Sequence, residues 1–573
     1  GGWFDGDKIR FRSGYVERIG GWDKVATTTF DGTCRNMLNF VTLNSDNFMF
    51  MGTHKKAYLE DGGDYNDITP LNKTVTCGAN PIATGTAGSG IITVTANSHG
   101  SKAGNYVTLA GATAVDGITA DEINKNFEIL TAPDANTFTV DTGGAASSGS
   151  TAGGGSSVTA AMEIDIGLNT TLLGNGWGAG TWGRFTWSSG AGSLAGQNLR
   201  LWKSDSWGED LLANLVDGRL YYWDATNGKT TRMVELSTLA GASDVPTTVR
   251  QVMVSDVDRH VLCFGSNALG SSTFDPLLIR WSSQESVTDW TPTATNTSGD
   301  LRLSQGSEIV CAIRTTRQIL VFTENSLHSV QFVGAPFVFG QALIGSNVRI
   351  AGPNTGISIN DVVYWMGQEN FYLYDGRIQT IPCSVRQYYC SAGSNEIDRY
   401  VIYNYLEQTW YYGSLVRTAW MDRSSGSRLY PQSPGTDGVL YNHEFGLDDG
   451  SQTPAVAINA YVQSSDFDIG DGQQFMLINR ILPDLNFGQS TATAPEVKFT
   501  MGARNFSGSV AGQGTASGDV TRTSVVSGDD NYTNQLHMRL RGRQMNLKIE
   551  SDTTGVKWRL GAPRLDMRPD GRR

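Results

Sequence analysis

The chain has 573 residues. A chain of this length is too long to fold around a single hydrophobic core, so roughly two to four domains are predicted. Gly is abundant (68 residues) and charged residues make up only 17%, a composition that favours short strands and tight turns over long helices. The formal net charge of −12 argues against a sequence-reading DNA-binding protein, which would show a basic face. No apolar run approaches the ~20 residues of a membrane-spanning helix, and no secretory signal pattern is present. Because the sequence starts at Gly1 without Met, residues upstream of it are expected.

The first predicted strand, within residues 3–22, carries a row of cations. Lys8, Arg10 and Arg12 alternate with Ile9 and Phe11, so the two-residue period of a strand places the three cations on one face. Such a row either protects an edge strand from pairing or forms a basic contact strip. The sequence leaves both interpretations open.

A hairpin motif repeats along much of the chain. In residues 361–381, two β-prone runs are joined by a polar turn and closed by Asp375-Gly376, the pattern of a hairpin within a larger sheet. Its core recurs at residues 58–62 and 221–225. Weaker copies lie at residues 184–187 with 199–202, 260–265 with 277–281, 319–322 with 327–332, 400–405 with 410–412, and 438–441. The spacing predicts an all-β fold, a β-propeller of roughly six to eight blades.

Residues 78–162 interrupt the repeats and are predicted to form an inserted small β-rich domain. Its expected elements are strands at 91–95, 106–109, 127–131 and 137–140 and a short helix at 119–126. The Gly/Ser/Ala-rich residues 145–158 are predicted to be a flexible tether. The expected domains are therefore 1–77 (N-terminal strand and first blade), 78–162 (insertion), 163–452 (remaining propeller) and 453–573 (C-terminal β-sandwich, a platform or docking domain).

The C-terminal end is basic. From Arg539 to Arg573 there are ten Lys and Arg against four Asp and Glu, a formal charge of +6, so the rest of the chain carries −18. A same-face row of arginines is predicted on one strand, with further arginines near the terminus. These are Arg539, Arg541 and Arg543, followed by Arg568, Arg572 and Arg573. Together with the N-terminal cations they form the candidate assembly interface, with a solvated sandwich face as the alternative.

The sequence assembles no catalytic, cofactor-binding or metal site. The six cysteines (Cys34, Cys77, Cys263, Cys311, Cys383 and Cys390) lack a CxxC pair and are predicted to be buried free thiols of a cytoplasmically made protein. The six histidines are equally dispersed. Asp205, Glu209 and Asp210 cluster, but a glycosidase pair needs a defined separation across a cleft.

Three further motifs are weak. The tryptophans of residues 177–187 are interpreted as blade core rather than a glycan-stacking patch. Residues 282–290 match the Asp-box turn of sialidases poorly, and residues 352–356 lack the Lys-Ser/Thr of a phosphate loop.

Long motifs outside the insertion resemble one family. They include WFDGDKIRFRSGYVERIGGW at residues 3–22, VVYWMGQENFYLYDGRIQTIPCSVR at 362–386 and RLDMRPDGRR at 564–573, with further matches at 275–310, 332–356 and 399–420. The chain resembles the tail nozzle, or tail tubular protein B, of short-tailed bacteriophages. The resemblance also implies a further strand pair near residues 387–388, where this sequence runs on directly.

The resemblance implies a non-enzymatic virion protein of the tail, assembled in the host bacterial cytoplasm. Six copies would form a ring below the adaptor of the portal vertex, around the DNA exit channel. Its partners would be other copies of itself, the adaptor and portal-vertex proteins, tail fibre proteins and double-stranded DNA in passage, with no cofactor. An acidic lumen would repel phosphates and let the duplex slide. The alternative function is a glycan-binding or glycan-cleaving propeller acting on the host surface.

Overall fold

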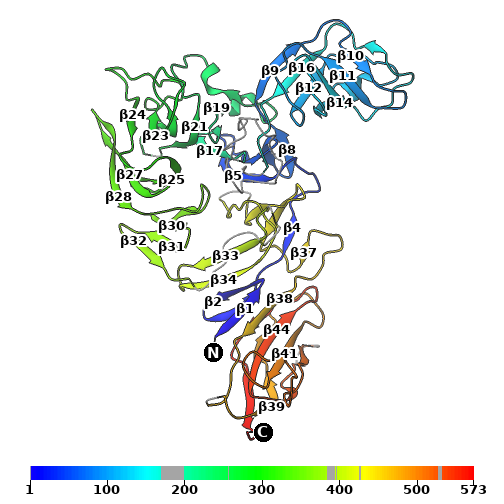
Figure 1. Ribbon diagram of the computed structural model, residues 1–573, viewed down its shortest axis with the longest axis vertical. Coiled ribbons are helices and arrows are strands. Elements are labelled where there is room, and N and C mark those ends of the chain that lie inside the picture. Colours follow the sequence, from blue (N-terminus) through cyan, green and yellow to red (C-terminus); the bar gives the residue numbers. More distant parts are fainter. Residues whose placement is uncertain are drawn as a thin grey trace, which may run out of the picture. The chain divides into compact units, whose positions relative to one another are not determined.

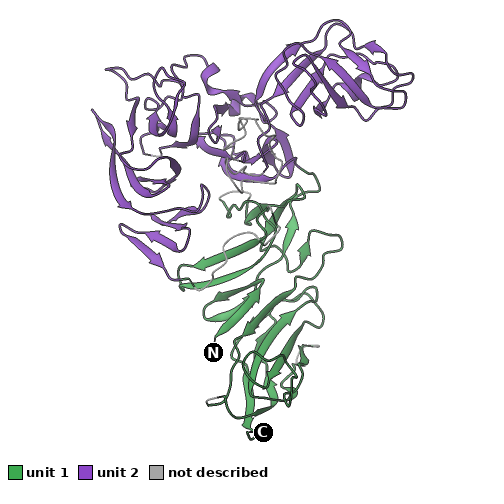
Figure 2. Cartoon of the chain, in the orientation of Figure 1, with its two compact units in different colours: residues 1–29, 383–573 green, residues 30–382 purple. Residues whose placement is uncertain are grey.

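The computed structural model describes residues 2–169, 199–255, 257–383, 391, 394, 396–424, 428–470, 472–526 and 532–572. Within these ranges nearly every element is a β-strand (Figure 1). The described helical elements are α1 (Ala120–Ile123) and the 3-10 turns η1 (Ala225–Asn227) and η2 (Leu236–Thr238). The predicted all-β class is confirmed. The chain divides into two compact units, residues 1–29 with 383–573 (unit 1) and residues 30–382 (unit 2), coloured separately in Figure 2.

Among the described residues, unit 2 contains seven four-stranded antiparallel sheets, and five of them are each built from four strands that follow one another in the chain. The first two are β5 (Cys34–Val41), β6 (Asn47–Thr53), β7 (Ala57–Asp61) and β8 (Asp64–Asp67), then β17 (Trp202–Trp207), β18 (Asp210–Leu215), β19 (Leu220–Trp223) and β20 (Val234–Glu235). The next two are β21 (Val249–Val254), β22 (Val261–Asn267), β23 (Phe274–Trp281) and β24 (Gly299–Arg302), then β25 (Ile309–Arg314), β26 (Ile319–Thr323), β27 (Ser326–Gly334) and β28 (Val338–Ser346). The fifth is β29 (Gly356–Ile359), β30 (Val362–Met366), β31 (Phe371–Tyr374) and β32 (Ile378–Ile381).

Neighbouring sheets of unit 2 meet through their first strands. β5 contacts β17, β17 contacts β21, β21 contacts β25, and β25 contacts β29. Four-stranded sheets that adjoin in this way are blades of a β-propeller, here numbered blade 1 to blade 5 in chain order. The contact between blades is close at Gly52 of β6, where an added Cβ would lie 2.6 Å from the side chain of Trp202 in blade 2.

The aromatic repeat predicted from the sequence occupies the same place in three blades. Residues 58–61, 221–223 and 372–374 lie in β7, β19 and β31, each the third strand of its sheet. The copies at 260–265 with 277–281 and at 319–322 with 327–332 pair as β22 with β23 and β26 with β27. The copy at 184–187 and the tryptophans of 177–187 lie outside the described residues.

The insertion between β8 and β17 folds as two four-stranded sheets around a separate apolar core. One sheet has the order β14-β11-β10-β15 and the other β13-β12-β16-β9. Their strands are β9 (Leu71–Thr76), β10 (Ile82–Thr84), β11 (Ile91–Thr95), β12 (Tyr106–Ala110), β13 (Asn126–Glu128), β14 (Thr137–Asp141), β15 (Ala152–Gly153) and β16 (Thr159–Glu163). The sheets begin at Leu71 and end at Glu163, because β9 and β16 pair along their length; the domain is therefore wider than 78–162. Helix α1 is shorter than predicted and starts with a capping box on Thr119.

The predicted flexible tether at residues 145–158 is wrong. Ala146 and Val158 are buried in the core of the insertion, and residues 152–153 form β15. The carboxylate of Asp116 accepts hydrogen bonds from the backbone N–H of Ser148 (3.0 Å) and Gly149 (2.7 Å). The side-chain hydrogen bond from Ser148 is the largest influence that lowers the pKa of Asp116. Small residues here let the chain turn closely around one carboxylate, and composition alone does not distinguish that from flexibility.

A buried ion cluster joins the insertion to the blades (the Lys56 cluster: Lys56, Asp67, Glu163, Arg232 and Asn126). Lys56 Nζ lies 2.7 Å from Glu163 Oε1 and 2.9 Å from Asp67 Oδ2. Arg232 Nη2 lies 2.9 Å from the same Glu163 oxygen, and Asn126 Nδ2 donates to it at 2.8 Å. Burial would raise the pKa of Asp67, but Lys56 and Arg232 hold it below its ordinary value. The insertion is thus fixed to blade 1 by charge as well as by its two connections.

Unit 1 holds two further sheets that continue the series in chain order. One is the ribbon of β33 (Arg399–Asn404) and β34 (Thr409–Ser414), which has two strands in the described chain. The other has the order β35-β36-β4-β37, made of β4 (Trp22–Lys24), β35 (Gln432–Pro434), β36 (Leu440–His443) and β37 (Asp449–Gly450). The predicted runs at 400–405, 410–412 and 438–441 fall in these sheets. In the part of the chain that the structure describes, the series therefore has seven sheets, five in unit 2 and two in unit 1.

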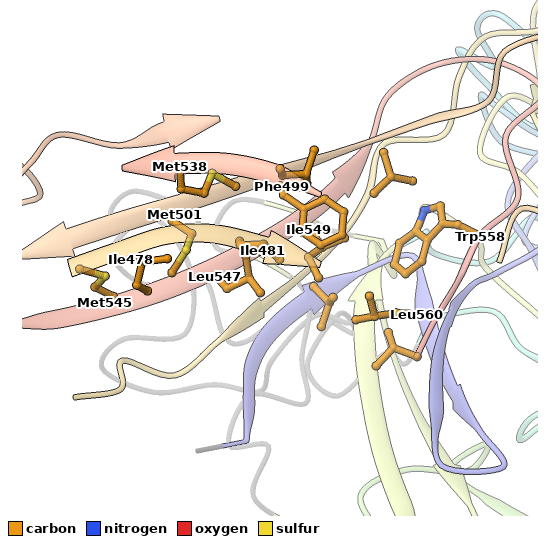
Figure 3. Packing of buried hydrophobic residues seen from close by; sticks show 14 of the residues in the cluster. Ile478, Ile481, Phe499, Met501, Met538, Met545, Leu547, Ile549, Trp558 and Leu560 are labelled. Carbon is orange, nitrogen blue, oxygen red and sulfur yellow. The ribbon is translucent and has the colours of Figure 1, made fainter. Parts of the chain in front are cut away.

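The C-terminal β-sandwich of unit 1 is built from three sheets, with orders β1-β38-β44-β41-β42, β43-β39-β46 and β2-β3-β45-β40. Their strands are β1 (Trp3–Asp7), β2 (Ile9–Arg12), β3 (Tyr15–Arg18), β38 (Ala460–Ser464), β39 (Met476–Leu482), β40 (Leu485–Asn486), β41 (Glu496–Arg504), β42 (Val520–Val525), β43 (Leu536–Gly542), β44 (Gln544–Ser551), β45 (Arg559–Leu560) and β46 (Arg564–Pro569). Figure 3 shows their shared core, in which Ile478 and Met538 of one sheet pack with Phe499 and Ile549 of another.

Residues 3–18 belong to this sandwich and β4 pairs with β36 of unit 1, so the predicted grouping of residues 1–77 with the first blade is wrong for the first 29 residues. β1 pairs antiparallel with β38, and β3 pairs with β45. Ile9 and Val16 are buried in the sandwich core. The apolar side chains of the N-terminal hairpin are buried against strands more than 400 residues away in the sequence. The local sequence does not reveal such a contact.

Candidate assembly face

The N-terminal cations are mostly engaged inside unit 1. Arg10 Nε lies 2.7 Å from Glu17 Oε1, and its Nη1 lies 2.9 Å from Glu444 Oε2. Lys8 Nζ lies 3.2 Å from Asp7 Oδ2. Arg12 Nη1 is 3.8 Å from Glu17 and its side chain is 64% exposed. Two cations of the row are therefore not free to form a contact strip.

The backbone also breaks the predicted row. Lys8 has φ +56° and separates β1 from β2, so it does not share a strand with Arg10 and Arg12. β2 is the edge strand of its sheet, which fits the alternative of an edge protected by charge. Burial is the largest influence on the pKa of Glu17 and would raise it, but Arg10 and Arg559 hold it below its ordinary value.

Arg539 and Arg541 lie on one outward face of the sheet β43-β39-β46. Along β43, Leu536, Met538 and Leu540 are buried while Arg539 is exposed and Arg541 half-buried. Arg539 has φ +53°, beside the bulge in the pairing of β43 with β39. The two-residue alternation is thus kept between buried and outward side chains, as predicted from the sequence.

Arg543 does not belong to this row. β43 ends at Gly542, and the Arg543 N–H donates to the Arg504 carbonyl at 2.8 Å in the turn before β44. The guanidinium groups of Arg541 and Arg543 lie 3.9 and 5.0 Å from the centre of the Phe475 ring. Arg541 also pairs with Asp570 at 2.5 Å. These two arginines hold the end of the sheet together, which a strand pattern could not show.

The other two strands of the sheet, β39 and β46, add arginines to the same face. Leu477 of β39 lies between Arg541 and Arg568, and Leu482 lies opposite Arg564. Arg480 is 3.4 Å from Asp566, and Arg568 is 3.7 Å from the same carboxylate with its side chain 69% exposed. The resulting basic face comprises Arg480, Arg539, Arg541, Arg564 and Arg568 with Asp566 and Asp570, a formal charge of +3.

Arg480 and Arg564 were missed in the sequence. Arg564, Asp566 and Arg568 alternate with Leu565 and Met567, and that period of two could have identified a third basic strand. Arg572 accepts a hydrogen bond from Arg543 through its carbonyl at 3.1 Å. Arg573 lies outside the described residues.

The whole net charge of the chain resides in unit 2. Residues 30–382 contain 20 Lys and Arg against 32 Asp and Glu, and unit 1 contains 24 of each. Unit 1 is therefore formally neutral although it bears the basic face, and unit 2 carries the full −12. A concentrated basic face and an acidic body are complementary surfaces on the same chain.

The carboxylates that suggested glycan cleavage are used within the blades. Asp205 is buried, accepts from the Val254 N–H at 2.8 Å and pairs with Arg314 at 3.0 Å. Asp210 accepts from the Ala225 N–H at 3.0 Å. Glu209 accepts from the Leu43 N–H at 3.1 Å. Each of the three carboxylates therefore has a partner within the blades.

A pocket of about 400 Å³ lies in the sandwich, bordered by Leu482, Phe487 and Arg564 among others. Its lining includes one carboxylate, Asp484, which accepts from the Ala562 N–H at 2.7 Å. Most glycosidase families place two carboxyl groups across the cleft, and the described lining of this pocket contains one.

Other signs of chemistry are also structural. Cys77, Cys263 and Cys311 are free and buried, which confirms the prediction of buried free thiols for these three, while Cys34 is buried and Cys383 is half-buried. Within the described ranges no cluster of His, Cys, Asp and Glu is arranged to hold a metal ion. None of the described helices has the length and apolar character needed to cross a membrane.

Comparison with known proteins assigns no family, since no family model and no curated protein matches the chain. Similar solved structures include BBS1N in complex with ARL6DN (9% identity, 75% of this chain and 96% of that chain, TM-score 0.28). Others are the endosialidase of phage phi92 (11%, 92% and 77%, TM-score 0.19) and BamB from Moraxella catarrhalis (10%, 77% and 99%, TM-score 0.25). Similarity at this level carries no functional assignment.

Proposed function

We propose that this chain is a structural subunit of the tail nozzle of a short-tailed phage. In this proposal, copies assemble into a homo-hexameric ring below the adaptor of the portal vertex, and DNA is retained and ejected through it. The resemblance of the motifs at residues 3–22, 362–386 and 564–573 suggests the family. The observation that carries the proposal is the basic face of the C-terminal sandwich in a chain whose net −12 lies entirely in residues 30–382.

Complementary charge suits a protein that assembles. A face with formal charge +3 is attracted most strongly to an acidic surface, such as unit 2 of a neighbouring copy or an acidic ring of the tail. Charge of this kind speeds encounter and sets register more than it adds affinity. The acidic blades would in turn repel the phosphates of a passing duplex rather than bind them.

The test is the mass of the full chain in solution as a function of salt. We expect a ring at low salt and weaker assembly as salt rises, because the Debye length falls from about 10 Å at 0.1 M to about 3 Å at 1 M. Reversal of the outward arginines, Arg539→Glu with Arg564→Glu and Arg568→Glu, should raise the concentration needed for assembly at least ~10-fold, a change of ~1.4 kcal/mol. The melting temperature should change little, since none of these side chains is buried.

A matched control variant tests whether an effect comes from the basic face or from the change in net charge alone. Lys73→Glu with Lys102→Glu and Lys125→Glu also reverses three exposed cations, but in the insertion. It should assemble like the unmodified chain. A protein that stays monomeric at all salt concentrations, or equal loss of assembly in both triple variants, would contradict the proposed function.

A further inference from the structure

The outer strand of blade 4 differs from the outer strands of the other blades. β28 has nine residues and no charged side chain, whereas β8, β20, β24 and β32 have four, two, four and four residues. The first three of these contain Asp, Glu or Arg. Short edge strands and charged edge side chains are two of the means by which β-proteins avoid pairing with one another. β28 has neither protection.

The edge of β28 is open. It stands last in the order β25-β26-β27-β28 and, among the described strands, pairs with β27 alone. Its outward backbone N–H and C=O groups therefore match an added strand. Leu343 at its centre is 43% exposed, so an added strand would also cover apolar surface.

The hairpin that β27 and β28 form ends in an apolar tip. Phe332, Val333 and Phe337 are 46%, 57% and 77% exposed. The base beneath them is firmly packed, because the Phe339 ring lies 5.7 Å from Phe332 and 5.3 Å from His260. The 21 residues 326–346 contain no Asp, Glu, Lys or Arg, although these make up 17% of the chain.

We infer that the hairpin of residues 326–346 is a contact between copies of this chain. The β28 edge accepts a strand of the neighbouring copy, and the tip packs on apolar surface beside that strand. This deepens the proposed function and rests on it for the existence of an assembly. The argument for a second copy is electrostatic: unit 2 carries −12 in every copy, so two copies repel least where they approach through an uncharged segment. Contacts between two different patches form a ring when the rotation from one copy to the next closes, and an open filament when it does not.

The first test is a charge-neutral double variant, Phe337→Glu with Leu343→Lys. The concentration at half-assembly, measured by mass photometry and sedimentation, should rise at least ~10-fold, equivalent to ~1.4 kcal/mol. The control is Val510→Glu with Leu43→Lys, which has the same charges at side chains 74% and 86% exposed. It should assemble like the unmodified chain. Assembly of the hairpin variant at the unmodified concentration would overturn the inference.

The second test needs no variant. Hydrogen exchange of the unmodified full chain should show β28 amides that exchange at least ~10-fold more slowly in the assembly than in the dilute monomer, as expected for newly paired strand amides. Equal exchange in a chain that does assemble would refute the hairpin contact and leave the proposed function standing. A chain that never assembles would refute both. Binding of such a monomer to phosphatidylcholine vesicles through the tip would assign the hairpin to a lipid surface instead and also overturn the inference.

Discussion

Removal of the Glu163 carboxylate should release the insertion from the blades. Glu163 is 1% exposed, and its Oε1 receives Lys56 at 2.7 Å, Arg232 at 2.9 Å and Asn126 at 2.8 Å. Glu163→Ala leaves the buried Lys56 and the half-buried Arg232 with only Asp67 as their carboxylate partner. Breaking one side of a buried ion pair costs ~3–5 kcal/mol, because the remaining charge keeps its desolvation penalty without its partner.

The expected loss of stability is confined to the strands that connect the insertion to the blades. Native-state hydrogen exchange should show the amides of β9 and β16 opening with a free energy lower by about 3–5 kcal/mol. The double variant Lys56→Met with Glu163→Leu removes a cation and an anion together and leaves Asp67 paired with Arg232. This double variant should lower the opening free energy by less than half as much as Glu163→Ala does, because replacing a whole buried ion pair with apolar residues is often neutral.

An exposed ion pair of the same region is the control. Lys102 and Asp165 lie 3.0 Å apart with side chains 76% and 57% exposed, and exposed pairs contribute about 0–1 kcal/mol. Lys102→Ala should therefore leave the opening of β16 nearly unchanged. A Glu163→Ala variant no less stable than Lys102→Ala would refute the structural role of the Lys56 cluster.

Three further predictions follow from burial. Replacing residues 72–161 with a Gly/Ser linker should leave the blades of unit 2 folded by circular dichroism, whereas loss of soluble protein would show that the insertion is part of their core. Burial lowers the pKa of His443 to about 3. Below pH ~6.5 only the unfolded chain gains the proton, so the free energy of unfolding of unit 1 should be highest above that pH and fall below it. In His443→Gln, the free energy of unfolding measured in urea should therefore change less between pH 7.5 and 5. Burial raises the pKa of Cys34 and Cys311 to about 12, so these thiols should react with Ellman's reagent only after unfolding, and prompt labelling of either would contradict this.

Local sequence patterns were sufficient to predict those strands and hairpins whose pairing partners lie close by in the sequence. The run at 371–374 pairs with residues on both sides of it within eleven positions, so its alternation and its Asp-Gly turn contain most of the information for a hairpin. The same holds for the blades of unit 2, whose strands are consecutive in the chain. The insertion boundaries were set too narrow because Val75 and Met162 belong to a strand pair that closes the domain from its two ends.

The candidate face was predicted only in part, since a period of two reveals a shared side of a strand but not what that side meets. Arg10 and Arg539 look alike in the sequence, each alternating with apolar residues. The fold brings Glu444, more than 400 positions away, to Arg10, while Arg539 remains exposed beside a bulge. Whether a cation is available to a partner therefore depends on carboxylates that arrive through tertiary pairing. A row of arginines becomes evidence for docking only where, as on β43, β39 and β46, the nearby carboxylates are too few to neutralise it.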